Sequence, residues 1–505
     1  MKKLTKILAI ILTLVMVFQA IPAAAFELDF GTDADAEEVL AVDALFEVPE
    51  LRTADTKHFR MSDGSYTMVR YNEPVHYEIS EDEWLEYDNT LSAADGTVRA
   101  ASSDANISFS KKSGETGLFT VENDDMGLFF ELKNAKSKNA RINNPAQPMR
   151  RSQNSMTNLE RLSTLTKQRS SLVYEDILDN IDLEYIVSGG KVKENIIVKS
   201  AMDEYIYEFA MDMDGLVPSM DENGNIYLDD AESGVLRYTI PAGYMFDADG
   251  NYSDAVEYTL TQDENGEYTL TVTADAAWIN QEDRVFPVKI DPTLTVAGSK
   301  TVDTYIDEAN PTQNYGNSVY INVGIDNNGN EKIGLIKITN FDGFPSSFVI
   351  TSAALQLDCG YLTDMIAALY PIKTNKSWSG STVTWNNFVS NDINDAIENT
   401  TIDYKMVTGN TKFDITSVVQ GWYAGNEMGM NGFAVRTLVP SNYDPVVSFA
   451  SNEKNYNFYN TPIFIVNYRD NKGIDSLQGI YFRFDIPAGQ SRVMYIDEIS
   501  YTKAG

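Results

Sequence analysis

Apolar and polar residues alternate in short runs over most of the chain. One series of runs begins near Lys57, and a second follows Thr301. Alternation with a period of two places apolar side chains on one face of a β-strand. Gly, Asn, Asp and Pro, which favour turns, separate the runs. The pattern therefore predicts antiparallel β-sheet in both halves of the chain.

Turn chemistry supports the strands of the first series. Gly189 and Gly190 separate two apolar runs, which predicts a hairpin. Asp-x-Asn-Gly or Asp-x-Asp-Gly stretches begin at Asp221, Asp247 and Asp263. An EF-hand calcium loop needs Gly at the sixth position and Glu at the twelfth, whereas Gly is fourth in all three stretches. We interpret them as hairpin turns.

The second series predicts ten short strands in about 170 residues, the spacing of a β-sandwich or jelly roll. The runs are SVYINV, KIGLIKIT, SFVITSAALQLD, AALYPI, TVTWNN, YKMVTG, KFDIT, GFAVRT, VVSFAS and TPIFIVNY. Only Thr416 to Ala424 has helical character, because Val418 and Trp422 would share one helix face. The predicted fold class is all-β, with two antiparallel sandwich or jelly-roll-like domains after a signal peptide.

Composition shifts divide the chain further. The predicted segments are a secretory signal peptide (1–25), an acidic leader (26–52), an N-terminal β-rich domain (53–292), a linker (293–300), a β-sandwich (301–470) and a C-terminal hairpin tail (471–505). A membrane anchor is the alternative for the first segment, although its apolar run is shorter than the ~20 residues that a spanning helix needs. A short helix around Ala36 to Phe46 is the alternative within the leader.

Charge limits the classes of partner. The formal net charge is −35, which argues against nucleic-acid binding, since phosphate recognition needs clustered Lys and Arg. Residues 133–169 are the exception, with nine Lys or Arg and one acidic residue. We interpret this basic segment as an exposed loop, with docking on the protein's own acidic surface or binding of an anionic polymer as alternatives.

Cysteine usage limits the chemistry that the chain can perform. The sole cysteine, Cys359, excludes an internal disulfide. A nucleophilic thiol needs a nearby histidine, and His58 and His76 lie far away in sequence. A buried, inert thiol is therefore expected.

The second domain resembles a known family. VDTYIDEANPTQNYGNSVYINVG, EKIGLIKI, ITSAALQL, WSGSTVTWNN and KFDITSVVQGW are similar to the DNRLRE domain, also classed as carbohydrate-binding module family 96. The resemblance covers about Thr301 to Asp470 and implies recognition of a polysaccharide, with an acidic polysaccharide, as in the family, as one candidate. The basic residue before the LIKF-like strand is usually Arg in this family and is Lys332 here.

The first region resembles the segment that precedes this module in large secreted bacterial RHS or YD-repeat proteins. KHFRMSDGS, PVHYEIS, WLEYDNTL, VYEDILDNIDLEYIVSGGKVKENIIV and RVFPVKIDPT carry that similarity. The repeats that would follow YRDNKGI are absent from this sequence. The resemblance implies a location that is secreted or at the cell surface.

A sugar site needs aromatic faces for the rings, and amides or carboxylates for the hydroxyls. The candidate ligand-binding residues are Tyr305, Asn314, Tyr315, Trp378, Asn386 and Asn387. Trp378 is the strongest candidate, because it lies in the polar loop from Lys373 to Thr382. Trp385 and Trp422 are instead expected in the core, because each has an apolar neighbour on its own face.

Asp303 and Asp307 lie on one face of an early predicted strand and are candidate ligands for a structural calcium ion. Calcium takes roughly six to eight oxygen ligands, so further ligands would have to come from elsewhere in the fold. A solvated strand face is the alternative.

Three functions follow from these observations. The leading hypothesis is a secreted, non-catalytic surface protein that binds a polysaccharide or cell-wall glycan. The second is an interaction scaffold, the N-terminal portion of a larger repeat protein that contacts other surface-protein domains. The third is a polysaccharide lyase or hydrolase; against it, no GxSxG, HExxH, P-loop or Cys-His motif is present.

Overall fold

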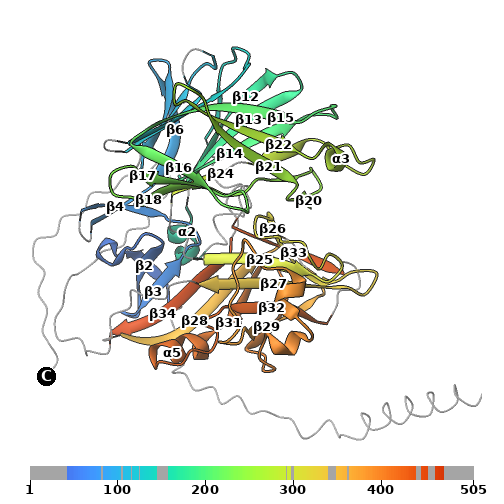
Figure 1. The fold of residues 1–505 in the computed structure, drawn as a ribbon. Helices are drawn as coiled ribbons and strands as arrows, with labels where there is room; N and C mark the ends of the chain where they lie inside the picture. Colours follow the sequence, from blue (N-terminus) through green and yellow to red (C-terminus); the bar gives the residue numbers. More distant parts are fainter. Residues whose placement is uncertain are drawn as a thin grey trace, which may run out of the picture. The chain divides into compact units, whose positions relative to one another are not determined.

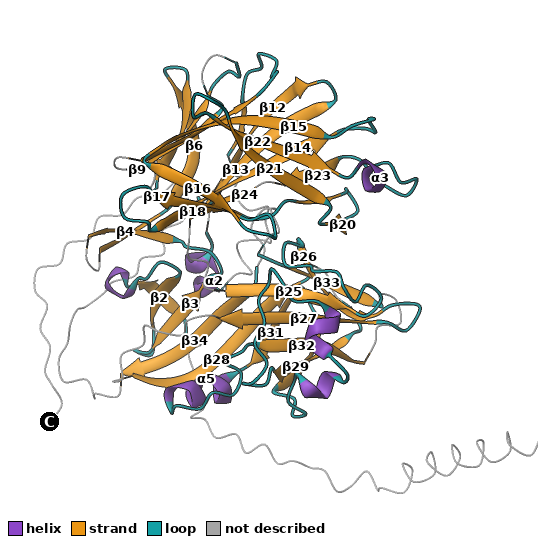
Figure 2. Ribbon diagram, in the orientation of Figure 1, coloured by secondary structure: helices purple, strands orange, loops and turns teal. Residues whose placement is uncertain are grey.

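The computed structural model describes most of the chain from Val42 to Asp470 (Figures 1 and 2). The described residues are 42–80, 83–103, 106–114, 117–123, 126–144, 157–165, 167–291, 293–296, 301–338, 348–360, 363–439, 445–452 and 461–470. The predicted signal peptide, nearly all of the acidic leader up to residue 41, and the predicted tail at 471–505 lie outside them. No helix of the described part is long and apolar enough to cross a membrane.

The all-β prediction is confirmed. Two sheets form a first sandwich. One has the strand order β21 (Val256–Gln262), β22 (Tyr268–Ala274), β15 (Ile206–Asp214), β10 (Met126–Leu132), β9 (Phe119–Asn123), β8 (Asn106–Ser110), β7 (Thr97–Ser102) and β6 (Asp88–Ala94). The other has the order β11 (Arg141–Asn143), β12 (Arg169–Leu178), β13 (Ile181–Ser188), β14 (Lys191–Val198), β24 (Thr293–Val296), β18 (Leu236–Ile240), β17 (Ile226–Asp230) and β16 (Leu216–Met220). β23 (Val288–Asp291), β19 (Tyr244–Phe246) and β20 (Tyr252–Ser253) extend that second sheet, and α3 (Ala276–Ile279) follows β22.

A second sandwich contains the other two large sheets. Its six-stranded sheet has the order β1 (Ala44–Glu47), β2 (Thr56–Met61), β3 (Tyr66–Arg70), β34 (Ile463–Asp470), β28 (Phe348–Asp358) and β31 (Asn410–Asp414). Its seven-stranded sheet has the order β30 (Asp403–Met406), β29 (Ile366–Pro371), β32 (Phe433–Val439), β27 (Glu331–Ile338), β26 (Tyr320–Ile325) and β33 (Val446–Ala450), with β25 (Thr301–Asp307) also on β27. The remaining elements are η1 (Pro49–Leu51), the hairpin β4 (His76–Ser80) and β5 (Glu83–Glu86), α2 (Asn158–Ser163), α4 (Trp385–Val389), η3 (Ile393–Asp395) and α5 (Thr416–Tyr423).

Each sandwich has its own apolar core, because alternate residues of the facing sheets point inward. Phe109 and Phe209 of one sheet share the first core with Leu183 of the other. In the second core, Leu355 of β28 meets Leu369 of β29. The predicted hairpin at Gly189 and Gly190 and the three Asp-initiated hairpin turns are confirmed.

The second sandwich is built from two distant parts of the chain. β3 pairs with β34, and the Thr67 hydroxyl donates a hydrogen bond to Asn467 at 2.6 Å. In Figure 1 the blue strands β2 and β3 lie beside the red strand β34. Residues 44–52 were expected in a solvated leader and residues 53–70 in the first domain, whereas β1 to β3 complete a sheet of the second. Alternation identifies a strand but not its partner.

Three other segments differ from the expectations. Thr293 to Val296, expected as linker, form β24 and pair with β14 and β18. The expected strand TVTWNN is instead a turn followed by α4, because the Thr384 and Asn387 side chains form a capping box that starts a helix. The basic segment contains β11 and α2, and Leu159 and Leu162 of α2 pack against a small core around Phe59.

Candidate functional site

A pocket of about 310 Å³ lies on the second sandwich. Three stretches of chain line it: the residues after β29, the residues before β30, and the loop between α5 and β32. The lining residues are Ile372, Thr374, Glu398, Thr400, Asn426, Glu427 and Met428. Ile372 is fully buried and Met428 is 38 % exposed, so the apolar part of the lining has both a covered and an accessible side chain.

Backbone hydrogen bonds fix the first two stretches against their neighbours. The Ile372 N–H donates to the Gly432 carbonyl at 2.9 Å, and the Lys373 N–H donates to the Ala396 carbonyl at 2.9 Å. The Glu398 N–H donates to the Pro371 carbonyl at 2.9 Å. The residues that follow β29 therefore continue the sheet between two partners, which holds Ile372 and Glu398 in place.

Two tryptophans hold the loop between α5 and β32. The Trp422 indole N–H donates to the Met428 carbonyl at 2.8 Å, and the Trp378 indole N–H donates to the Asn431 carbonyl at 2.8 Å. The Asn431 amide in turn donates to the carbonyls of Lys373 and Thr374, at 2.9 and 2.7 Å. These bonds join the loop to the opposite wall of the pocket.

Glycine is required at the end of this loop. Gly432 has φ +96°, and a Cβ there would lie 2.3 Å from the Ile336 carbonyl oxygen. Residues other than glycine rarely adopt this backbone conformation. The close approach to β27 therefore fixes where the loop leaves the pocket and enters β32.

Several polar groups of the lining have no hydrogen-bond or ion-pair partner among the residues that the structure describes. They are the Glu398 and Glu427 carboxylates and the Thr374 and Thr400 hydroxyls. The Asn426 Oδ1 accepts the Met428 N–H at 2.9 Å, which leaves the amide NH₂ of Asn426 as a donor. Acceptors, hydroxyls and an amide donor beside apolar surface are the groups that bind a polyhydroxylated molecule.

The predicted ligand residues Tyr305 and Tyr315 are covered. They are 5 % and 7 % exposed, and their rings stack with centroids 4.1 Å apart. Burial raises the pKa of the Tyr315 hydroxyl well above its usual value, so this side chain stays neutral. A sugar ring has no access to either face, so the structure assigns both side chains to packing.

The predicted residues Asn314, Trp378, Asn386 and Asn387 do come together, at one corner of the second sandwich. The Asn314 amide donates to the Gly380 and Val383 carbonyls at 2.8 and 2.6 Å. The Asn386 N–H donates to Pro311, and Asn387 caps α4. Trp378 is half-buried, and the Lys337 ammonium lies 5.5 Å from the centre of its ring. Trp378 and Asn314 thus hold loops together, while the Asn386 side chain is exposed.

Asp303 and Asp307, the candidate calcium ligands, are both buried. Asp307 forms an ion pair with Lys332 and accepts the Ala309 N–H at 3.0 Å, and Asp303 accepts the Asn452 N–H at 3.1 Å. In the described part of the chain, no three His, Cys, Asp or Glu side chains are grouped so as to hold a metal ion. Calcium binding stays a prediction.

The pocket residues were not identified from the sequence. Glu398, Asn426 and Glu427 come from separate loops, and nothing in the alternation pattern brings them together. The one available signal was the stretch AGNEMGMNG after the predicted helix, whose three glycines at positive φ mark a tightly folded loop.

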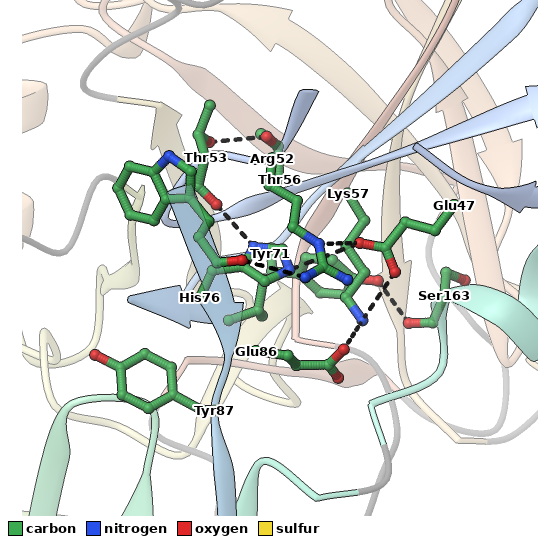
Figure 3. Close-up of polar contacts among 12 residues, drawn as sticks. Glu47, Arg52, Thr53, Thr56, Lys57, Tyr71, His76, Glu86, Tyr87 and Ser163 are labelled. Atoms are coloured by element: carbon green, nitrogen blue, oxygen red, sulfur yellow. Dashed lines mark hydrogen bonds and ion pairs between the residues drawn. The ribbon is translucent and has the colours of Figure 1, made fainter. Parts of the chain in front are cut away.

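A largely buried polar network is formed by residues near the N-terminal end of the described chain (Figure 3). Glu47 accepts a hydrogen bond from Arg52 Nε at 2.6 Å and lies 3.8 Å from the Lys57 ammonium. Lys57 donates to Glu86 at 2.8 Å. The His76 Nδ1 donates to the Thr53 carbonyl at 2.8 Å, and its Nε2 lies 3.8 Å from Glu47.

Burial decides the charge state of both histidines. Desolvation lowers the pKa of His76 from 6.5 to about 4, against the opposing effect of its bond to Thr53. Desolvation likewise lowers the pKa of His58 to about 4, and its Nδ1 bonds to the Tyr468 hydroxyl at 2.6 Å. Lys57 and His76 are 3 % and 1 % exposed, so a substrate cannot reach them. The network is suited to joining β1, β2, β4 and β5, not to catalysis.

The thiol of Cys359 is buried, as expected, and its Sγ lies 3.4 Å from the Thr408 carbonyl oxygen. Both histidines lie in the N-terminal strands β2 and β4, whereas Cys359 follows β28. No Cys-His nucleophilic pair is among the contacts of the described residues.

Comparison with known proteins identifies part of the chain. Residues 295–468 match the model of carbohydrate-binding module family 96. Two similar curated proteins are the tRNA nuclease WapA of Bacillus subtilis strain 168 and the tRNA3(Ser)-specific nuclease WapA of Bacillus spizizenii. Each is 26 % identical over 417 residues, which is 77 % of this chain and 16 % of the relative. The chain thus spans about a sixth of the length of these relatives, and the family match is confined to residues 295–468.

Proposed function

We propose that the second sandwich binds a polysaccharide at the pocket between β29 and the α5–β32 loop, in a protein that is secreted or held at the cell surface. The observation that carries the proposal is the coincidence of two findings. A carbohydrate-binding family model matches this sandwich, and the same sandwich carries a pocket lined by unpaired hydrogen-bonding groups. Unpaired acceptors and hydroxyls in a pocket held by fixed backbone are what sugar recognition needs.

A binding role without catalysis fits these features best. The relatives are named as tRNA nucleases, but that function is theirs, and this chain aligns with about a sixth of each of them. The formal charge of −35 opposes contact with a polyphosphate backbone. We therefore assign the chain the attachment of a protein to a glycan, not the cleavage of RNA.

A second candidate function is an interaction scaffold. The 417-residue similarity to much longer relatives favours it, because an alignment over 77 % of this chain extends beyond residues 295–468 into the first sandwich. In that role the two sandwiches would contact other domains of a larger protein, and the glycan pocket would be secondary.

The full chain should be tested on a glycan array and by affinity electrophoresis in gels containing single polysaccharides. We expect retardation by at least one polysaccharide, and loss of that retardation in Asn426→Ala, because the variant removes the free amide donor of the pocket. Asn327→Ala is the matched control, since Asn327 is exposed in the β26–β27 turn. Urea unfolding of each variant shows whether the fold is intact.

Absence of binding to every glycan, with or without calcium, would contradict the proposal and favour the scaffold. Release of new reducing ends from a bound polysaccharide would show a hydrolase or lyase instead. Retardation that persists in Asn426→Ala would place the site elsewhere on the chain.

A further inference from the structure

One ion pair of the first sandwich places a nucleophile against a carboxyl group. Lys193 of β14 and Asp291 of β23 lie on adjacent antiparallel strands (Figure 2), and the lysine Nζ contacts the aspartate Oδ2. Their side chains are 7 % and 0 % exposed. We propose that these two side chains condense into an intramolecular amide, an isopeptide bond, so that the pair is a site of covalent self-modification.

Burial distinguishes this pair from lysine pairs elsewhere in the described chain. Glu86, the partner of Lys57, is 35 % exposed, and Lys332, which pairs with Asp307, is 18 % exposed. Water hydrates the charges at those sites and stabilises the ions. At the pair in β14 and β23 that hydration is lost, so transfer of one proton to give an uncharged amine and carboxylic acid becomes less costly.

Tyrosine side chains enclose the reacting groups. The Lys193 Nζ donates a hydrogen bond to the Tyr244 hydroxyl and lies 5.0 Å from the centre of that ring. Tyr244 is 3 % exposed, its backbone pairs with Asp291, and its ring stacks on Tyr252 with centroids 5.6 Å apart. The Tyr258 hydroxyl donates to the Asp291 backbone carbonyl at 3.4 Å. These contacts hold amine and carboxyl together and keep bulk water away, which favours a reaction that releases water.

The reaction balances without an external reagent. Proton transfer from the ammonium to the carboxylate leaves an electron pair on Nζ, which attacks Cγ and forms the N–C bond. The tetrahedral carbon then breaks one C–O bond, a proton from the nitrogen passes to the leaving oxygen, and one water departs. The Tyr244 hydroxyl, which is bonded to Nζ, can accept that proton and give its own to the leaving oxygen.

A buried acceptor beside the pair suits the product. Asn195 is two residues from Lys193, on the same face of β14, and is fully buried. Its amide donates to Glu184 at 3.0 Å, whereas its Oδ1 has no hydrogen-bond partner among the residues that the structure describes. The N–H of the new amide supplies a donor on this face. A hydrogen bond from it to the Asn195 Oδ1 would offset the cost of burying that oxygen.

The bond would link strands that are distant in sequence. It closes a loop of about 100 residues, and a cross-link over such a long loop strongly restricts the unfolded chain. Cys359 is the sole cysteine, so the chain cannot form an internal disulfide. An amide would give the first sandwich a covalent cross-link that reducing agents leave intact.

Mass spectrometry of the purified full chain under denaturing conditions tests the proposal. We expect a mass one water below the value calculated from the sequence of the purified protein. Protease digestion should release one branched peptide that contains both Lys193 and Asp291, and tandem fragmentation should locate the link between them. A natively folded wild-type chain with the full calculated mass, or a link between other residues, overturns the proposal.

Lys193→Arg keeps the positive charge but replaces the amine with a guanidinium, so we expect a folded chain that has lost no water. Lys332→Arg is the matched control at a more exposed pair and should still lose one water. Circular dichroism shows whether each variant is folded. A loss that persists in Lys193→Arg would arise elsewhere, for example from a succinimide at an Asp-Gly step, and would overturn the proposal. Should this variant fail to fold, the branched peptide of the wild type decides.

Tyr244→Phe removes the proton relay and leaves the reacting pair in place. In chains sampled at successive times after cell-free synthesis, we expect the water to be lost several-fold more slowly than in the wild type. An unchanged rate would overturn the role of Tyr244. Glycan binding does not enter any of these measurements, so this proposal and the proposed function stand or fall separately.

Discussion

Two regions of this protein bury charged groups in opposite ways. In the network of Glu47, Arg52, Lys57 and Glu86, carboxylates and cations are paired, and the enclosed His76 is neutral. In the first sandwich, Lys193 of β14 forms an ion pair with Asp291 of β23, while its sequence neighbour Glu194 has no cation beside it.

The difference follows from how each region is built. Loops and short strands from several elements surround His76, so oppositely charged groups can approach from different sides. Glu194 lies on the central strand β14, where burial and, to a smaller extent, the charge of Asp291 raise the pKa of its carboxyl to about 8, against the opposing effect of a hydrogen bond with Tyr185. Folding raises the pKa of Glu194 and lowers the pKa of His76, so the stability of the two regions depends on pH in opposite directions.

The largest effect should come from breaking the ion pair of the first sandwich. Lys193→Met leaves Asp291, which is 1 % exposed, as a buried charge without its cation. We expect the free energy of unfolding to fall by roughly 3 to 5 kcal/mol. Urea denaturation measures it, with Lys199→Met as the control at an exposed pair, where less than about 1 kcal/mol should be lost. Similar small losses in both variants would refute the buried-pair interpretation.

The next effect should come from Glu194→Gln. An acid whose pKa rises on folding, here from 4.5 to about 8, stabilises the native state at low pH, and this stability is lost as pH rises between those values. Replacing it with a neutral amide should raise the free energy of unfolding by about 3 kcal/mol at pH 7. The gain should vanish near pH 4, and a gain that is independent of pH would contradict this cause.

A smaller effect of opposite sign is expected from His76→Asn, which keeps a donor for the Thr53 carbonyl. A base whose pKa falls on folding, here from 6.5 to about 4, stabilises the native state above pH 6.5, and this stability is lost as pH falls between those values. At pH 5 the wild-type chain should lose about 2 kcal/mol to His76 relative to pH 7. The variant should lose less than the wild type, and His58 accounts for the part that remains. Unchanged acid sensitivity would show that His76 is solvated.

Turns and helix ends in this protein could be predicted from adjacent residues, whereas the pairing of distant strands could not. Gly189 and Gly190 were sufficient to predict a hairpin, because turn geometry depends on residues that are neighbours in sequence. Trp385 was placed on a strand because it alternates with Val383, whereas the capping box at Thr384 and Asn387 determines a helix.

The candidate site illustrates the same limit. Trp378 lies in a loop, as its polar surroundings predict, and its indole N–H donates to the carbonyl of Asn431 in the loop that lines the pocket. Glu398 and Asn426 could not be associated from the sequence, because only the folding of β29 and α5 brings their loops together. A pocket made of loops depends on the positions of elements that the alternation pattern leaves undetermined.

The pairing of β3 with β34 has a consequence for the timing of synthesis. Thr67 and Asn467, which bond across these strands, are 400 residues apart. At ribosomal rates of about 5 to 20 residues per second, roughly 20 to 80 s separate their appearance. During that interval β3 has an unpaired edge of the kind that joins other strands. The second sandwich therefore cannot finish folding before nearly all of the described chain has been made.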